Sequence, residues 1–318
     1  MLRFLSIKLF HAVMTLLLVS IVVFIGIRLL PGDPAQIMAG DNQDPAVIAA
    51  YRAELGLDQP MVVQYWHYLV DLVTGNLGMS SSSGRPVAEM IAQTLPVTVQ
   101  LAAITIVLSV VCGLAFGVAA AYWRGRWPEW LSNGISLLGL SIPNFWLAIL
   151  AIVYLASAIS WLPASGFVPF ATDPGGWFLH LIMPALILGT SLCAVVMRQT
   201  RSNMIEALGS EYVLASRVKG AGEPRVVVVH ALRNSIIVVV TLVGLHAGAL
   251  LSGAAVIEQI FGLPGVGRLA VNSVFLRDYA VLQGVVMVSA AVYVVINLAV
   301  DLLYSVIDPR IRVSGRTA

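Results

Sequence analysis

The chain has 318 residues, of which 59% are hydrophobic and 11% charged, whereas soluble domains are about 45–50% apolar. The composition therefore predicts an integral membrane protein. The formal net charge is only +2 and the basic residues are spread among several loops, which argues against a nucleic-acid-binding protein.

Six apolar stretches follow one another along the chain, each able to cross a bilayer as a helix of about 20 residues. They cover residues 9–30, 97–122, 134–158, 180–197, 235–257 and 281–303. Lipid leaves no partner for an open backbone polar group, so we expect an all-α membrane protein with about six transmembrane helices. The fourth stretch is the shortest, and the Pro in "LSIPNFW" allows a local break in the third.

The first stretch follows a short basic end, as the apolar part of a signal peptide would. It is 22 residues long and no A-x-A cleavage site follows it. We therefore expect residues 1–30 to be a cytoplasmic N-terminus and a retained first transmembrane helix.

The distribution of Lys and Arg predicts the orientation, because cytoplasmic loops carry the excess of these residues. With the N-terminus inside, 13 of the 18 basic residues fall on the inner side. The inner pieces are residues 1–8, 123–133, 198–234 and 304–318. Both termini are therefore predicted to be cytoplasmic.

Residues 31–96 form the largest predicted extracytoplasmic segment. "DPAVIAAYRAELGL" has a helical pattern, with Asp44 as a candidate N-cap, Pro45 in the first turn and Gly56 near the end. A second amphipathic run, "MVVQYWHYLVDLVTG", stops near Gly75, and "SSSSGRP" then reads as a turn. The segment is too short and interrupted to be an obvious enzyme domain.

The sequence contains few residue patterns that are typical of catalytic or metal sites. It contains no HExxH, GxSxG or P-loop motif, so we expect no catalytic residue and no metal site, and any ATP to be bound by another chain. Cys112 and Cys193 lie in apolar segments without metal-ligand spacing and are expected to be small buried hydrophobes.

A few polar or aromatic side chains inside the membrane stretches are candidates for lining a pathway through the bundle. Asn144, Phe145 and Trp146 are candidates by polarity and position only, and packing is the alternative role. His246 has no second ligand three or four residues away, which favours a core histidine over a metal ligand or proton relay. Gly113, Gly117 and Ala121 form a row of small residues suited to close helix packing.

A Gly- and Pro-rich bend follows the fifth stretch, in "EQIFGLPGVGRL". Such a backbone turns sharply or re-enters the protein. A gate or a contact for a binding protein and a simple capped loop are both open interpretations. The residues concerned are Glu258, Phe261, Gly262, Pro264, Gly265 and Gly267.

The polar segment "EYVLASRVKGAGEPRVVVVHALRN", residues 211–234, separates the fourth and fifth stretches. Residues 211–220 favour a short amphipathic helix, "GAGEP" ends it, and Pro224 can open the next helix. One helical row holds Glu211, Ala215 and Lys219, and the next holds Tyr212, Ser216 and Gly220. A docking surface for another protein and a solvated loop that only enforces topology are both consistent with this pattern.

This segment resembles the cytoplasmic EAA loop of bacterial ATP-binding-cassette (ABC) importer permeases, in the version of the dipeptide/oligopeptide/nickel permease group. The matching residues are Glu211, Tyr212, Arg217, Lys219, Gly220, His230, Ala231, Leu232, Arg233 and Asn234. "RLLPGDPA", "EQIFGLPGVGRL" and "NLAVDLLYSVIDPRIR" are similar to the same group at the same relative places. Two residues depart from the family pattern. Ser216 stands where the second Ala of the motif is usual, and Val238 stands where a Pro often follows the second helix of the loop.

The resemblance implies a type I ABC importer transmembrane domain in the bacterial cytoplasmic membrane, with residues 97–318 as its core and residues 198–234 as its coupling loop. It implies that the residues that couple the permease to the ATPase are Glu211, Tyr212, Ala215, Ser216, Arg217, Lys219 and Gly220. Among them, Glu211, Ala215, Ser216 and Gly220 form the docking face, and Arg217 and Lys219 are available for ion pairs at its rim. The implied partners are a second permease, two ATPase subunits that bind ATP and Mg²⁺, and an extracytoplasmic substrate-binding protein. The permease itself binds no cofactor.

The resemblance also implies import of short peptides, either dipeptides or oligopeptides. Nickel chelates and glutathione-like solutes are alternatives for the same architecture. A more distant alternative is a stand-alone secondary transporter, which is motivated by a six-helix hydrophobic chain that contains His246 and Asp301.

Overall fold

The computed structural model describes residues 2–29, 34–39, 44–54, 56–156 and 162–307. Helices dominate these residues, and the only strand-like feature among them is an isolated bridge between Met79 and Pro86. The chain divides into two compact units. The first comprises Met1–Pro96 and Arg268–Leu298, and the second comprises Val97–Gly267 and Ala299–Ala318.

The helices of the described residues that can cross a membrane are compatible with the expected number. By length and composition, three described helices can span a bilayer, in the ranges Ser6–Leu29, Val87–Tyr122 and Tyr279–Leu302. Three further pairs of helices pass the same test but are bent, which gives up to six spans. The all-α membrane fold predicted from the sequence is thus confirmed.

The first unit contains the helices that precede the second predicted span, together with the end of α13 and most of α14. Its elements are α1 (Leu2–Leu29), α2 (Pro34–Ala39), α3 (Pro45–Glu54), α4 (Met61–Thr74), the start of α5 (Val87–Tyr122), α13 (Val266–Phe275) and α14 (Tyr279–Ile307). Asp44 caps α3, since its carboxylate accepts the N–H of Ala46 at 2.9 Å. Gly75 ends α4 in the left-handed conformation, φ +79°. Both helix boundaries confirm the sequence prediction.

Polar contacts join α4 to α1 in the first unit. The Ser20 and Tyr65 hydroxyl groups lie 2.8 Å apart. The Arg28 guanidinium lies 3.5 Å from the centre of the Phe24 ring and donates to Gln64 Oε1 at 2.7 Å. The second amphipathic run is therefore fixed to the first transmembrane helix by side chains that the hydrophobic pattern alone does not reveal.

A buried carboxylate holds the turn between α13 and α14. Asp278 is 1% exposed, and its Oδ2 accepts hydrogen bonds from Ser80 Oγ at 2.6 Å, Ser82 Oγ at 2.8 Å and Ser82 N at 3.2 Å. Burial alone would raise the pKa of Asp278, but these hydrogen bonds to the charged form outweigh it and lower the pKa. The predicted turn "SSSSGRP" therefore also anchors the start of α14.

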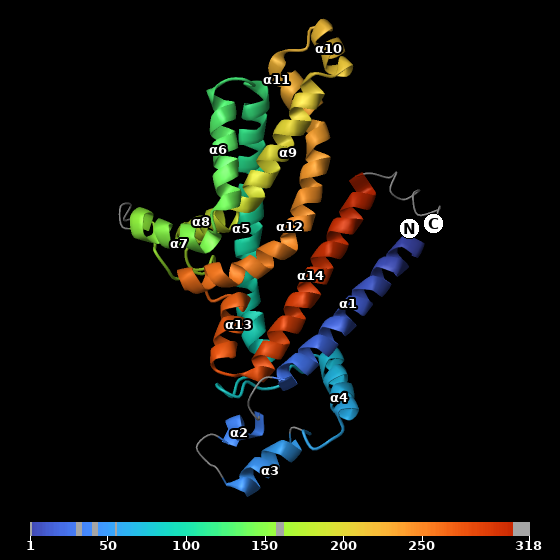
Figure 1. Cartoon of the computed structure of the whole chain (residues 1–318), viewed down its shortest axis with the longest axis vertical. Coiled ribbons are helices and arrows are strands. Elements are labelled where there is room, and N and C mark those ends of the chain that lie inside the picture. The colour runs from blue at the N-terminus through green and yellow to red at the C-terminus, as the bar shows by residue number, and fades with distance from the viewer. Residues whose placement is uncertain (1, 30–33, 40–43, 55, 157–161, 308–318) are drawn as a thin grey trace. The chain divides into compact units, whose positions relative to one another are not determined.

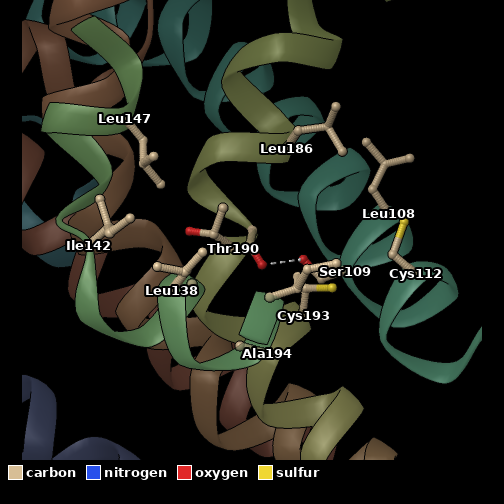
Figure 2. A pocket seen from close by; sticks show the side chains of 13 residues that line it. Leu108, Ser109, Cys112, Leu138, Ile142, Leu147, Leu186, Thr190, Cys193 and Ala194 are labelled. Carbon is tan, nitrogen blue, oxygen red and sulfur yellow. Dashed lines mark hydrogen bonds between the residues drawn. The ribbon is translucent and has the colours of Figure 1, made fainter. Parts of the chain in front are cut away.

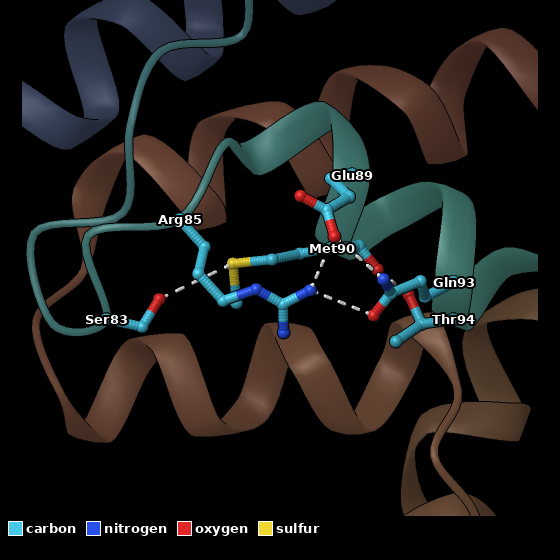
Figure 3. A network of polar contacts seen from close by, with 6 residues as sticks. All are labelled: Ser83, Arg85, Glu89, Met90, Gln93 and Thr94. Atoms are coloured by element: carbon cyan, nitrogen blue, oxygen red, sulfur yellow. Dashed lines mark hydrogen bonds and ion pairs between the residues drawn. The ribbon is translucent and has the colours of Figure 1, made fainter.

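The start of α5 carries a second polar network (Figure 3). Arg85 donates to Glu89 Oε1 at 2.9 Å and to Gln93 Oε1 at 3.0 Å, which links the loop to the first two turns of the helix. The helix begins at Val87, ten residues before the apolar stretch, and continues through Pro96. The predicted boundary between residues 96 and 97 lies within this helix, at the position where the two compact units also divide, and it stays a prediction.

The second unit is a bundle arranged around α9 (Figure 1). Its elements after α5 are α6 (Trp127–Ser141), α7 (Asn144–Leu150), the π-helical η1 (Ala151–Ala156), α8 (Pro174–Leu188), α9 (Thr190–Leu208), α10 (Glu211–Val218), α11 (Glu223–Arg225), the π-helical η2 (Val226–Ala231) and α12 (Leu232–Phe261). Helix α9 packs against α6 on one side and α12 on the other. Figure 1 shows α10 beyond the end of α9, away from α7.

Small residues allow α5 to approach α9, as the sequence predicts. A Cβ added to Gly113 would lie 2.7 Å from the Val196 side chain. One added to Gly117 would lie 2.7 Å from the Met197 carbonyl oxygen. Any larger residue at either position would push the two helices apart.

The third and fourth apolar stretches are bent rather than straight. Helices α6 and α7 meet at 106°, because Ile142 and Pro143 interrupt them and Pro has no N–H to continue the helix. Helices α8 and α9 meet at 61° next to Gly189. The Gly189 carbonyl accepts the Ser109 hydroxyl at 3.0 Å, which holds this bend against α5.

Candidate functional site

The helix α10 rests on a small apolar base. Val213 on its inner face is completely buried, and α10 contacts α9 and η2. These elements, with α5 and α12, contribute the apolar base, which consists of Ala121, Met204, Ala207 and Ala231, with Val118, Ile205, Leu208, Val227 and Leu232 around them. The Tyr212 hydroxyl donates to the His230 carbonyl oxygen at 3.3 Å, tying α10 to η2. The short helix predicted from the sequence is confirmed, and it is held against α9 and η2.

The outer face of α10 is open and partly apolar. Leu214 is 60% exposed and Val218 is 82% exposed, next to the exposed Glu211 and Ala215. Positions 211, 214, 215 and 218 lie on one helical face. We call these four residues the outer face of α10. Large apolar side chains this exposed in an otherwise charged loop are typical of a contact surface.

The helix ends in a left-handed glycine cap. Gly220 has φ +83°, its N–H bonds to the Arg217 carbonyl at 2.9 Å, and the Ala221 N–H bonds to the Ser216 carbonyl at 3.1 Å. This is the Schellman pattern, which favours glycine because a Cβ is strained at positive φ. A Cβ on Gly220 would meet nothing within 4 Å. The glycine is therefore required by the backbone turn and not by a close neighbour within the chain.

The basic residues predicted at the rim have different surroundings. Arg217 pairs with Glu223 at 2.8 Å, joining α10 to α11. Lys219 is exposed at the helix end. Pro224 stands in the first turn of α11, as expected.

The structure brings the predicted coupling residues together on α10 and its cap. Glu211, Tyr212, Ala215, Arg217, Lys219 and Gly220 are exposed and Ser216 is half-buried. Leu214 and Val218 on the same face were not among the predicted residues, although a count of apolar residues at i, i+3, i+4 and i+7 could have singled them out.

A second candidate region is the elbow between α12 and α13, which meet at 81°. Glu258 is completely buried there, and the Thr98 hydroxyl donates to its Oε1 at 2.6 Å. The same hydroxyl accepts the Val266 N–H at 2.9 Å. One threonine of α5 thus joins the end of α12 to the start of α13.

The glycines of the elbow are required by both conformation and space. Gly262 has φ +65° and ends α12, and the Leu263 N–H bonds to the Glu258 carbonyl at 2.9 Å. A Cβ on Gly265 would collide with the Glu258 carboxylate, and one on Gly267 would collide with the backbone of Ala255.

The predicted role of the elbow residues as a gate or binding-protein contact stays a prediction. Phe261 is 1% exposed and its carbonyl accepts the Gly166 N–H at 2.9 Å, so it and Glu258 face the interior of the second unit. Pro264 is exposed. Of the six predicted elbow residues, Pro264 is therefore the one most available to a partner, while Gly262 and Gly267 are partly exposed.

The pathway candidates do not form one cluster. Asn144 accepts the Thr190 hydroxyl at 3.0 Å and donates to the Leu188 carbonyl at 3.5 Å, which secures α7 to the bend between α8 and α9. Phe145 and Trp146 point outward, with exposed fractions of 50% and 48%. His246 is half-buried in α12. Packing explains Asn144 directly, while Phe145 and Trp146 are available to lipid or a neighbouring chain.

A cavity of about 400 Å³ lies between α5, α6, α8 and α9 (Figure 2). Its walls are almost wholly apolar and include Leu108, Leu138 and the free thiols of Cys112 and Cys193. No charged side chain lines it, so it is poorly suited to the charged ends of a peptide. Among the residues that the structure describes, no three His, Cys, Asp or Glu residues gather as a metal site would require.

Comparisons with known proteins cover nearly the whole chain. A profile of the family "Binding-protein-dependent transport system inner membrane component" matches residues 113–313, and one for the N-terminal part of such components matches residues 1–102. A protein of Brucella abortus (strain 2308), named as a peptide transport system permease, is 42% identical over 302 residues, covering 95% of this chain and 96% of the relative.

Two relatives carry the name of a different solute. The glutathione transport system permease proteins GsiC of Escherichia coli O6:H1 and of Salmonella typhimurium are each 42% identical over 312 residues. Each match covers 98% of this chain and 99% of the relative. The similarity therefore extends over residues 31–96, residues 198–234 and the elbow alike.

Proposed function

Because this chain belongs to the family of inner membrane components of binding-protein-dependent transport systems, we propose that it forms part of the pathway of an ATP-driven importer for short peptides. Its partners in this proposal are a second permease, two ATPase subunits and an extracytoplasmic binding protein. The chain is a transport subunit rather than an enzyme. ATP hydrolysis belongs to the partner ATPases.

The outer face of α10 carries the proposal. It is the exposed part of a short helix whose inner face is anchored by Val213 and whose end is fixed by the Gly220 cap and the Arg217–Glu223 pair. A rigid surface loses little conformational entropy on binding. Leu214 and Val218 supply apolar contact, and Glu211 supplies charge at the edge. We assign this face as the docking surface for the ATPase.

Helix α12 connects the region of α10 to the elbow, and in this proposal it transmits the conformational change of the ATPases along the chain. Helix α12 begins after η2, to which α10 is bonded through Tyr212, and runs 30 residues to Phe261, or about 45 Å. A displacement of α10 would move the near end of α12, and the elbow with Glu258 and Thr98 would receive the motion at the far end. The bends and tight glycine contacts favour rigid-body tilting over continuous deformation.

The substrate class rests on the relatives, whose printed names give peptides and glutathione. Glutathione is itself a short peptide with charged ends, so both names share one chemistry. We therefore propose short peptides with free charged termini as the class, including glutathione-like tripeptides. Nickel chelates remain the alternative for the same architecture.

Reconstitution tests the function. The permease pair, its ATPases and its binding protein in proteoliposomes should import a radiolabelled dipeptide or glutathione only with ATP, and Ala215→Trp on the outer face of α10 should abolish this uptake. Ala103→Trp, at an exposed alanine of α5, is the matched control and should transport normally.

Two outcomes would contradict the proposal. ATP-dependent uptake of chelated nickel without any uptake of peptide would overturn the substrate class. Uptake by the purified chain alone, driven by an ion gradient, would favour the secondary transporter and overturn the importer.

A further inference from the structure

A groove of about 380 Å³ lies between the end of α5 and the start of α6, at the end of the second unit that also carries α10 (Figure 1). Its apolar walls come from Phe116, Ala119, Trp123, Trp127 and Leu131. The Ser132 hydroxyl donates to the Phe116 carbonyl at 3.2 Å and closes the bottom of the groove. From Phe116 to Trp123 the groove follows about 10 Å of helix.

Exposed aromatic residues place the mouth of this groove at the membrane–water interface. Trp127 and Trp130 are each 74% exposed, and Trp123 and Tyr122 are 43% and 44% exposed. Trp and Tyr gather where hydrocarbon meets the headgroups, because their rings have an apolar body and a polar edge. The groove therefore runs from headgroup level into the depth of the acyl chains.

One unpaired cation stands at the mouth. Arg126 lines the groove, and its guanidinium makes no hydrogen bond or ion pair with another of the described residues. The nearby acid does not neutralise it, because Glu129 accepts the Gly125 N–H and pairs with Arg201. An apolar channel with a free guanidinium at headgroup level matches a lipid phosphate above an acyl chain.

A neighbouring groove lacks this combination and serves as an internal comparison. It lies on the other side of Trp123, between α5, α11 and η2, and is about 440 Å³. Its charged lining residue is Glu223, a carboxylate already paired with Arg217. Charge complementarity to an anionic headgroup therefore distinguishes the α5–α6 groove.

We infer that the α5–α6 groove is a binding site for one anionic phospholipid, with an acyl chain between Phe116 and Leu131 and the headgroup phosphate on Arg126. Beside the α10 base, such a lipid would brace the α5–α6 hairpin on which that base partly rests. Loss of the lipid is expected to loosen this end of the second unit.

Native mass spectrometry of the delipidated permease complex tests the site. Phosphatidylglycerol and phosphatidylcholine with the same acyl chains are titrated separately, and the wild type should bind phosphatidylglycerol more tightly. Arg126→Gln should weaken phosphatidylglycerol binding about fivefold and leave phosphatidylcholine binding unchanged. Leu131→Gln, at an exposed wall position, should weaken binding of both lipids.

Arg225→Gln removes one exposed charge outside the groove and is the matched control; it should leave both affinities unchanged. An unchanged preference for phosphatidylglycerol in Arg126→Gln would overturn the site. Full displacement of the lipid by inorganic phosphate would also overturn it, because the apolar groove would then contribute nothing.

Discussion

The α10 loop and the α12–α13 elbow end their helices with the same backbone device but have opposite surroundings. Gly220 and Gly262 both take positive φ, +83° and +65°, and both are followed by a Schellman hydrogen bond. Around Gly220 the space is open, whereas Gly265 and Gly267 are pressed against Glu258 and Ala255. The cap alone therefore does not determine whether a turn is a surface or an internal joint.

What differs is where the nearby side chains find their partners. In the elbow the carboxylate of Glu258 is satisfied by Thr98 inside the same unit. On α10 the apolar side chains of Leu214 and Val218 have no apolar cover of their own. Where the side chains find their partners within the chain, as in the elbow, we expect substitutions to reduce stability. Where apolar side chains are left uncovered, as on α10, we expect substitutions to weaken the binding of a partner subunit.

The largest expected effect is at the elbow. Gly265→Val would force a side chain into the space of the Glu258 carboxylate and should destabilise the protein by about 3 kcal/mol or prevent folding. Gly134→Val in α6, where a Cβ meets nothing within 4 Å, should change stability by less than about 1 kcal/mol. Thermal unfolding of the detergent-solubilised proteins measures both. Equal melting temperatures would contradict the packed elbow.

The next effect concerns the other internally completed turn, at Asp278. Asp278→Asn should cost about 1.5–3 kcal/mol at pH 7, because charge-assisted hydrogen bonds from Ser80 and Ser82 are lost. The folded pKa of Asp278 is lowered, so this stability is present at neutral pH and disappears as the pH falls through the folded pKa, below about 3.9.

Melting curves of the wild type and Asp278→Asn from pH 7 to pH 3 measure this difference. The gap between the two proteins should narrow only in the most acidic part of the range. A gap that is independent of pH would show that the charge of Asp278 contributes nothing.

A smaller effect is expected at the α10 cap. Gly220→Ala should cost about 1 kcal/mol through strain at positive φ, and Gly220→Asn should cost less, because Asn tolerates this conformation. Hydrogen exchange of the α10 amides reads out the local change. If Ala and Asn behaved alike, a steric role for Gly220 at a partner interface would replace the conformational one.

The elements that local sequence signals determine were predicted well. Asp44 before Pro45, Gly75 after an amphipathic run and "GAGEP" after residues 211–218 all mark helix boundaries that the structure confirms. For Pro143 the sequence indicated only that a local break was allowed, because a proline can either kink or end a helix. The resemblance over several motifs predicted the family, which the profiles confirm.

Contacts between distant residues could not be read from the sequence. Thr98 and Glu258 are 160 positions apart, and Ser80 and Asp278 are 198 apart. No periodicity identifies such partners, and a buried acid in a Gly-rich bend looks the same as an exposed one. The exposure of Leu214 and Val218 likewise depends on which side of α10 meets the apolar base.

The most direct test of α10 as the docking element compares how the ATPase subunit binds to two permease variants, each substituted at one of two equally exposed leucines. Leu214 on α10 and Leu276 in the turn before α14 are both 60% exposed, so Leu214→Glu and Leu276→Glu introduce the same change at similar surface cost. Co-purification of the assembled complex should lose the ATPase, by at least about tenfold as for a central contact residue, only with Leu214→Glu. Full retention of the ATPase by Leu214→Glu, or equal loss with both variants, would contradict α10 as the docking element.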